Sequence, residues 1–422
     1  MILTSCMHDT EELFDKPAAE RMTESLQTYR DLLTAQTNGW LVEYYPEKTQ
    51  KYGGFNLYFR FEGEHVTVRS EIDPAASATS AWSMGSDMGP TINFDTYNTV
   101  LHYFSDPAIN QGGGQGLNYE GDYEFYVENG TETEFILRGK KTRNIIRMTP
   151  FPANFSWGEY GNSLQRMRDN VIVPAYKITV GNREIAIEKS IGANFFILKI
   201  NDETIYAPFM VTLSGIKFYT PIEIGNETLQ LFTYHAEDDN LISDQRNSVI
   251  SFPSITLSNY FVDYLTLTNW YFKTEDIGQE YLPAWDAAKD SLNKDGETLL
   301  LMWFGALDTD FPAGISFACW DEENNAAWFG TYVYDFEIIN DNRIKFVYNS
   351  DKTVKDGINA EWYAHRLQDF TIAAFDGKTF TLEPDVDITN PKNFTKIQNF
   401  KLTDTTNPNH WVNVGMKTVI WP

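Results

Sequence analysis

"GDYEFYVENGTETEFILRGKKTRNIIRM", residues 121–148, alternates large apolar side chains with charged or polar ones. Tyr123, Phe125 and Val127 fall on one face of an extended chain, and they alternate with Glu124, Tyr126 and Glu128. Asn129-Gly130 then supplies the two positive-φ positions that a two-residue hairpin turn needs. The stretch therefore predicts an antiparallel hairpin with one buried face.

The same alternation recurs on both sides of this hairpin. Residues 55–61 place aromatic and aliphatic side chains on one face, and a turn follows at Glu62-Gly63. Further alternating segments run through residues 183–235 and 297–384. Short strands joined mainly by hairpins indicate antiparallel barrels or sandwiches rather than βαβ units.

We therefore predict a mainly β protein with two antiparallel barrel- or sandwich-like units, lipocalin-like in outline, and a leading N-terminal helix. Met22, Leu26, Tyr29 and Leu33 recur at helical spacing after Pro17 and give this helix one apolar face. The polar stretch after residue 236 marks the domain boundary. The predicted divisions are 1–16 as signal remnant and acidic tether, 17–245 as helix plus N-terminal β domain, and 246–422 as C-terminal β domain.

Composition limits the partners. The chain has 422 residues with 42% hydrophobic and 15% aromatic content, which is enough for sizeable cores. Its net charge of −26 repels phosphate backbones and anionic lipid surfaces, so we predict no nucleic-acid binding. Two cysteines far apart, Cys6 and Cys319, exclude a disulfide framework.

The first residues resemble a lipidation signal. "LTSC" ends at Cys6, and acidic residues follow as they would in a solvated tether. Only five residues precede Cys6, too few for a charged segment and an apolar segment, so the true start would lie upstream. The alternative is an incidental surface cysteine in a disordered tail. We predict lipidation at Cys6, with contact to the membrane only through that anchor.

Four features together resemble a family of Bacteroidetes lipoproteins classed as a domain of unknown function. They are the "SC" with its acidic residues, "NGWLVEYYP" at 38–46, "YGGFNLYFRF" at 52–61 and "GIKFYTPIEI" at 215–224. The resemblance implies export, anchoring through Cys6 and display on the outer membrane at the cell surface. It also implies association with a TonB-dependent uptake complex, and it carries over no catalytic residues.

Candidate metal ligands are sparse. No His or Cys pair has zinc-ligand spacing. Asp308 with Asp310, and Asp385 with Asp387, supply the first two positions of a calcium loop, although the pattern favours a plain turn at both places. We predict no cofactor.

Aromatic residues in Gly- and Ser-rich stretches are candidate ligand contacts. Trp82 and Tyr97 flank one predicted long loop, and Trp157 and Tyr160 lie in another. Sugars and flat macrocycles stack on such rings at the open ends of barrels. The alternative is that these rings are buried anchors that hold the loops to the core.

These observations favour binding over catalysis. We predict a non-enzymatic, lipid-anchored surface protein that binds a nutrient ligand, a small molecule or glycan, for an outer-membrane uptake system. One alternative is a glycan-acting hydrolase that uses two carboxylates, which the sequence cannot single out among 59 acidic residues. The other is an adhesin or structural surface protein.

Overall fold

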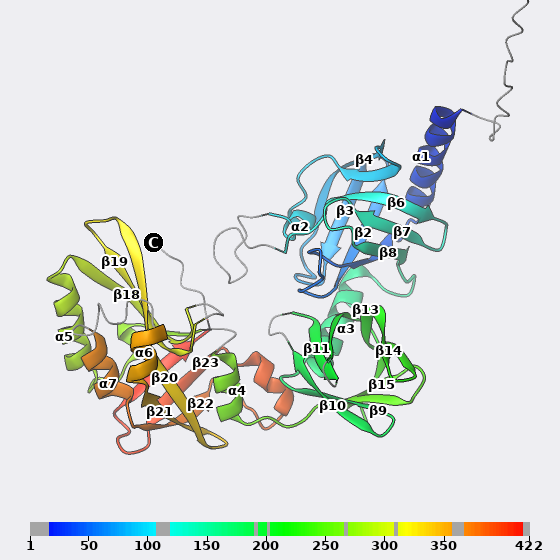
Figure 1. The fold of residues 1–422 in the computed structure, drawn as a ribbon. Coiled ribbons are helices and arrows are strands. Elements are labelled where there is room, and N and C mark those ends of the chain that lie inside the picture. The colour runs from blue at the N-terminus through cyan, green and yellow to red at the C-terminus, as the bar shows by residue number, and fades with distance from the viewer. Residues whose placement is uncertain are drawn as a thin grey trace, which may run out of the picture. The chain divides into compact units, whose positions relative to one another are not determined.

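The computed structural model describes residues 17–106, 119–189, 193–200, 203–265, 269–307, 311–356 and 367–416. Its sheets form three closed antiparallel barrels, each of eight strands (Figure 1). The chain divides into two compact units. One consists of Met1–Val171 with Lys177–Ser251, and the other of Ile172–Tyr176 with Phe252–Pro422.

The first barrel follows helix α1 (Ala18–Ala35) and closes when β1 pairs with β8. Its strands are β1 (Trp40–Tyr44), β2 (Phe55–Glu62), β3 (His65–Ser70), β4 (Ala78–Ser86), β5 (Pro90–Phe94), β6 (Glu124–Gly130), β7 (Phe135–Gly139) and β8 (Ile145–Pro150). The predicted turn at Glu62-Gly63 is confirmed, and Gly63 supplies its positive φ of 57°.

Both ends of the first barrel are covered by helices. At one end Arg30 of α1 lies 4.8 Å above the ring of Trp82 and donates to the carbonyl of Gly63. At the other end α2 (Thr99–His102) leads to Phe104, whose ring contacts Tyr44 and Phe55. Large buried side chains fill the space between, so the barrel interior is a packed core and not a ligand chamber.

The hairpin at residues 121–148 forms, but its turn lies later than predicted. Asn129 and Gly130 belong to β6, where a bulge after Val127 precedes their pairing with β7. The turn is made by residues 131–134, and Thr131 donates its amide proton to the carbonyl of Glu134. A glycine is needed at 130 because a Cβ there would lie 2.4 Å from the Phe135 ring. Space for that ring, and not a positive φ, explains the glycine.

The second barrel follows α3 (Trp157–Val171) and closes when β16 pairs with β9. Its strands are β9 (Tyr176–Val180), β10 (Arg183–Lys189), β11 (Phe195–Ile200), β12 (Glu203–Val211), β13 (Gly215–Ile224), β14 (Glu227–His235), β15 (Asn240–Ser243) and β16 (Ser248–Ser251). Its buried side chains include Phe196, Phe209, Phe218 and Phe232, whose rings pack in succession.

Main-chain hydrogen bonds join the first two barrels. Gly54 donates to the carbonyl of Phe209 at 2.9 Å, and Asn194 donates to the carbonyl of Tyr52 at 3.1 Å. Between them Gly53 has φ +73°, and a Cβ on it would lie 2.1 Å from the Asn194 carbonyl oxygen. The two backbone segments approach each other more closely here than a side chain at position 53 would permit.

A buried carboxylate reinforces this junction. Glu71 accepts hydrogen bonds from the main-chain and side-chain amides of Asn56, at 3.2 and 2.6 Å, and from Arg168 of α3 at 3.0 Å. The Asn56 side chain also donates to the carbonyl of Val211 in the second barrel. One group of side chains thus links a barrel wall, a helix and the neighbouring barrel.

The third barrel forms the second compact unit, and β17 closes it by pairing with both β18 and β24. Its strands are β17 (Trp270–Phe272), β18 (Glu297–Gly305), β19 (Gly314–Asp321), β20 (Ala326–Asn340), β21 (Arg343–Tyr348), β22 (Thr379–Pro384), β23 (Asn399–Asp404) and β24 (Trp411–Gly415). The remaining elements are α4 (Leu257–Tyr264), η1 (Thr274–Asp276), α5 (Leu282–Asn293), α6 (Ser350–Asp356), α7 (Asp369–Phe375) and η3 (Pro391–Lys396).

This third interior is also packed. Trp270, Phe304, Phe346 and Phe400 lie in one buried cluster, to which α4, α5 and α7 contribute apolar side chains. Cys319 is buried in the same cluster.

The predicted class, mainly β with antiparallel barrels and a leading helix, is confirmed. The structure has three barrels where the sequence predicted two units. The predicted boundary at residue 245 falls between β15 and β16, which pair with each other, and the compact units divide after Ser251. The polar residues that suggested a boundary form the last hairpin of the second barrel.

Candidate functional site

Trp82 is part of the core of the first barrel. It lies in β4, and much of the stretch after it, which we predicted as a long loop, is the hairpin of β4 and β5; its side chain is 2% exposed. Its ring meets Phe61 edge-on at 4.5 Å, and the Arg30 guanidinium lies 4.8 Å from the ring centroid. These contacts are those of a packing residue.

Trp157 and Tyr160 are brought together, on helix α3 and not in a loop. Both rings contact Tyr58 on the wall of the first barrel, with centroids 4.6 and 5.5 Å away. Trp157 also stacks on Phe151 at 5.1 Å. The helix is thereby held against the barrel through aromatic contacts.

Tyr97 differs from the other three aromatic candidates, because it is 57% exposed. Its ring lies 4.6 Å from His102, which stacks in turn on Tyr123 at 4.8 Å. Its hydroxyl donates to Asp106 at 2.8 Å. Burial lowers the pKa of His102, so the middle ring of this stack favours its neutral form.

The predicted metal ligands divide between described and undescribed parts of the chain. Asp385 accepts from the Asn399 side chain at 2.7 Å, and Asp387 accepts from the amide and hydroxyl of Thr389 at 2.9 and 3.0 Å. Asp308 and Asp310 lie outside the described residues. Within the described ranges, no group of three or more His, Cys, Asp or Glu side chains could hold a metal ion.

The predicted lipidation site, Cys6, also lies outside the described residues. Among the helices that the structure describes, none is both long enough and apolar enough to span a bilayer.

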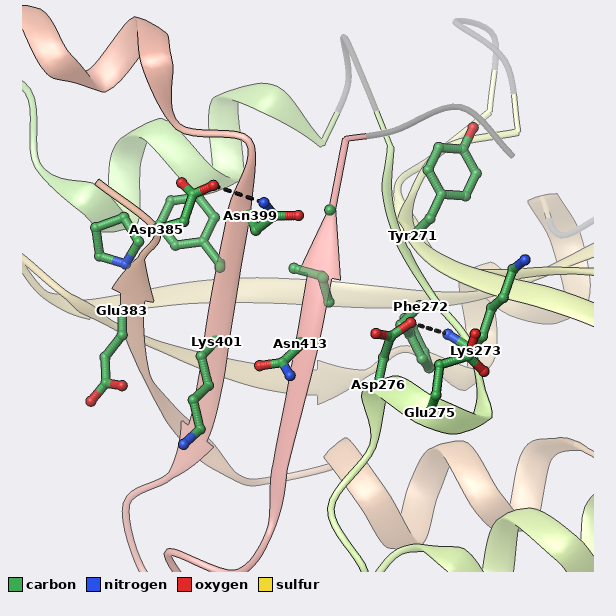
Figure 2. A pocket seen from close by; sticks show the side chains of 14 residues that line it. Tyr271, Phe272, Lys273, Glu275, Asp276, Glu383, Asp385, Asn399, Lys401 and Asn413 are labelled. Carbon is green, nitrogen blue, oxygen red and sulfur yellow. Dashed lines mark hydrogen bonds between the residues drawn. The ribbon is translucent and has the colours of Figure 1, made fainter. Parts of the chain in front are cut away.

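A groove of about 830 Å³ opens on the outer wall of the third barrel (Figure 2). Its lining comes from four separate segments, which lie within residues 271–276, 383–385, 399–401 and 413–415. They are brought together because β22, β23, β24 and β17 are successive strands of the barrel wall.

Strand β17 gives the groove one of its sides. It pairs with β24 at Tyr271 and Gly415, and the next bridge between these segments is Ile277 with Val412. Between the two bridges η1 turns away from the ladder, which places Lys273, Glu275 and Asp276 beside the groove in Figure 2.

Strand register places the polar side chains of the groove in two rows. Glu383 pairs with Lys401, and Lys401 pairs with Asn413, so these three outward side chains cross β22, β23 and β24 in line. The second row runs through Asn399, Gly415 and Tyr271. Alternation of side chains along each strand turns Phe400 and Val414, between these positions, into the core.

The charge of the groove is mixed with an acidic excess. Glu275, Asp276, Glu383 and Asp385 line it with only two lysines, Lys273 and Lys401. Burial raises the pKa of Asp276, against the lowering effect of the hydrogen bond it accepts from the Lys273 amide.

Of the groove residues, only Asp385 was predicted as a site residue from the sequence. The signal for the others was the polar half of the alternation in residues 399–404 and 411–415. That signal predicts an outward face but cannot say which distant strands adjoin it.

Comparison with known protein families matches residues 10–236 to "Domain of unknown function (DUF4302)". The chain belongs to this family. The match confirms the prediction of a domain of unknown function. In this DUF4302 protein the matched residues cover the first barrel and most of the second, so the groove lies outside them.

No curated protein matches this DUF4302 protein. Among solved structures, a Caulobacter crescentus beta sliding clamp aligns at 10% identity over 94% of this chain and 97% of that one, with a TM-score of 0.13. A Bartonella birtlesii sliding clamp aligns at 8% identity over 94% and 98%, with a TM-score of 0.12. Scores this low carry no argument about fold or function.

Proposed function

We propose that this DUF4302 protein is a non-enzymatic binding protein, anchored at the cell surface through a lipid on Cys6, which captures a nutrient ligand for an outer-membrane uptake system. The groove of the third barrel is the capture site. The chemistry of this role is recognition alone, through hydrogen bonds and ring contacts on a surface that is already formed.

The observation that carries the proposal is the contrast between packed barrel interiors and one open, polar groove. Ligand sites are concave, with a few polar groups placed to fix orientation. Among the described residues, large apolar side chains pack the interiors of all three barrels. The groove offers concavity, an aromatic ring and side chains able to donate and accept hydrogen bonds.

The contacts of the groove carboxylates support binding over hydrolysis. A glycoside hydrolase needs one acid to protonate the leaving oxygen and a second to act as nucleophile or base. Asp385 is tied to Asn399 and to the amide of Gln398, and Asp276 caps η1 through the amide of Lys273. Two of the four groove carboxylates, Asp276 and Asp385, therefore serve the local fold.

The anchor is tested on intact cells that make the full-length precursor. Surface biotinylation should label the protein, and mass spectrometry should find acyl chains on Cys6. Cys6→Ser should release the protein from sedimented membranes. An unlabelled wild type, or a Cys6→Ser variant that still sediments, would refute the surface-anchored role.

Ligand capture is tested by thermal shift of the purified chain against a panel of glycans, peptides and flat macrocycles. A ligand at about 100 times its dissociation constant should stabilise the folded state by about 2.7 kcal/mol. The shift should disappear in Asn413→Trp, which fills the groove at an exposed position. A panel without any groove-dependent shift would favour the adhesin alternative.

A further inference from the structure

We infer that the groove takes a neutral oligosaccharide, laid across β22, β23 and β24 with one sugar ring against Tyr271. This inference rests on the proposed function, since it names the ligand class of the same site. Three features of the groove lead to it: an aromatic ring held in place, a row of side chains with free hydrogen-bonding capacity, and an acidic balance of charge.

Gly415 makes room for a groove amide. Its register partners are Asn399 on one side and Tyr271 on the other. A Cβ at this position would lie 2.5 Å from the Asn399 side-chain oxygen, so only a glycine lets this amide lie beside the backbone of β24. The Asn399 amide therefore forms this part of the floor, next to the Tyr271 ring.

Tyr271 supplies the stacking surface. It is half-buried, packs at 5.7 Å against Trp303, and accepts a hydrogen bond from the Asn269 side chain at 3.3 Å. A ring held on one side keeps its orientation before ligand arrives, which reduces the entropy lost on binding. The C–H groups of a sugar ring are attracted to the negative face of such an aromatic ring.

The row of Glu383, Lys401 and Asn413 provides complementary hydrogen bonding. Within the described part of the chain these three side chains have no hydrogen bond or ion pair to another residue. They are an acceptor, a donor, and an amide that is both. Each hydroxyl of a sugar donates and accepts, so a hydroxyl-rich chain can satisfy the whole row.

Charge and polarity exclude two other ligand classes. Four carboxylates against two lysines, in a chain of net charge −26, repel uronate or sulfated polysaccharides. A flat apolar macrocycle needs a mostly apolar pocket, whereas the side chains of the floor are amides and a lysine. An extended peptide would add to an unpaired strand edge, such as the short part of β24 between its bridges to Tyr271 and Ile277, and it is one arm of the test.

The test is isothermal titration calorimetry of the full chain with three probes of matched length. These are a neutral glucan oligosaccharide series, a uronic-acid oligosaccharide and an uncharged peptide. Only the neutral series should bind, and Tyr271→Ala should weaken it about tenfold, equivalent to about 1.4 kcal/mol. Tyr206→Ala, at a 63% exposed tyrosine of the second barrel, is the matched control and should bind as wild type.

A second variant guards against a folding defect in Tyr271→Ala. Asn413→Ala removes an exposed side chain that has no partner among the described residues, and it should also weaken binding while the melting temperature stays unchanged. Groove-dependent binding of the acidic chain or the peptide alone would overturn the sugar assignment and leave the proposed function standing. Neutral oligosaccharides that bind equally well to both groove variants would place the site elsewhere and overturn the inference.

Discussion

Replacing Arg168 by Met should destabilise the first compact unit, because it leaves the buried Glu71 carboxylate without its ion-pair partner. The Glu71 side chain is 4% exposed and that of Arg168 is 26% exposed. Burial is the main influence on the pKa of Glu71 and raises it, while Arg168 and Asn56 oppose the rise. Breaking a buried pair costs about 3–5 kcal/mol, and the partial exposure of Arg168 places this pair near about 3 kcal/mol.

Urea unfolding of the full chain should record this loss, and amide hydrogen exchange in α3 and β2 should locate it. For a domain of 150–250 residues, a deficit of about 3 kcal/mol lowers the melting temperature by about 6–12 °C. Arg166→Met is the control, since Arg166 is exposed on the same helix and reaches only Ser163. Its effect should stay within about 0.5 kcal/mol.

The pH dependence of this stability loss tests whether the buried charge of Glu71 causes it. A carboxyl whose folded pKa is raised binds protons more tightly in the folded state, so stability falls as pH rises from the ordinary value of 4.5 through the folded pKa. Loss of Arg168 raises that pKa further. The Arg168→Met deficit should therefore be larger at pH 7 than at pH 5, and Glu71→Gln in the same chain should recover most of it. Equal deficits at both pH values, or a double variant no more stable than Arg168→Met, would refute the reasoning.

Three further predictions concern other parts of the molecule. Trp82→Ala should cost about 3–5 kcal/mol by thermal melting because it empties a core site, whereas exposed Tyr97→Ala should change stability by less than about 0.5 kcal/mol; similar costs for both would contradict the packing described above. Gly53→Ala should destabilise the junction of the first two barrels, since the new Cβ would lie 2.1 Å from a carbonyl oxygen. If Gly53→Ala melts like the wild type, the two backbone segments can move apart there without cost. The hydrogen bond from the Asn409 side chain is the main cause that lowers the pKa of Glu280. The ionised Glu280 carboxylate therefore stabilises the fold above its ordinary pKa, and this stabilisation is lost as pH falls through the lowered pKa of the folded state. NMR titration of Asn409→Ala should show a higher pKa for Glu280, and an unchanged pKa would show that this hydrogen bond is not the cause.

Local alternation was sufficient to predict the class of the fold, because side-chain period and hairpin turns are properties of neighbouring residues. It failed at Asn129-Gly130, where the glycine makes room for Phe135 and the turn is built by Thr131 instead. It also failed at Trp157 and Tyr160, where glycines at 158 and 161 suggested a loop although the segment is helical.

The division of the N-terminal region into two barrels and the groove were beyond sequence reasoning for a different reason. The weak patterning after residue 236 conceals two short strands, β15 and β16, and β16 closes the second barrel by pairing with β9, about seventy residues earlier. The groove depends on the order of strands around a closed wall, and Gly415 acquires its role only from Asn399 and Tyr271 beside it. Such neighbours are set by topology, which no single segment encodes.

A fragment that stops at residue 236, where the family match ends, would lack β15 and β16. Strands β14 and β9 would then each present a row of unpaired amide and carbonyl groups, which is a template for self-association. Extending the fragment to Ser251 removes both open edges. Soluble expression of the family's characteristic region should therefore depend on a few residues that its sequence signature does not include.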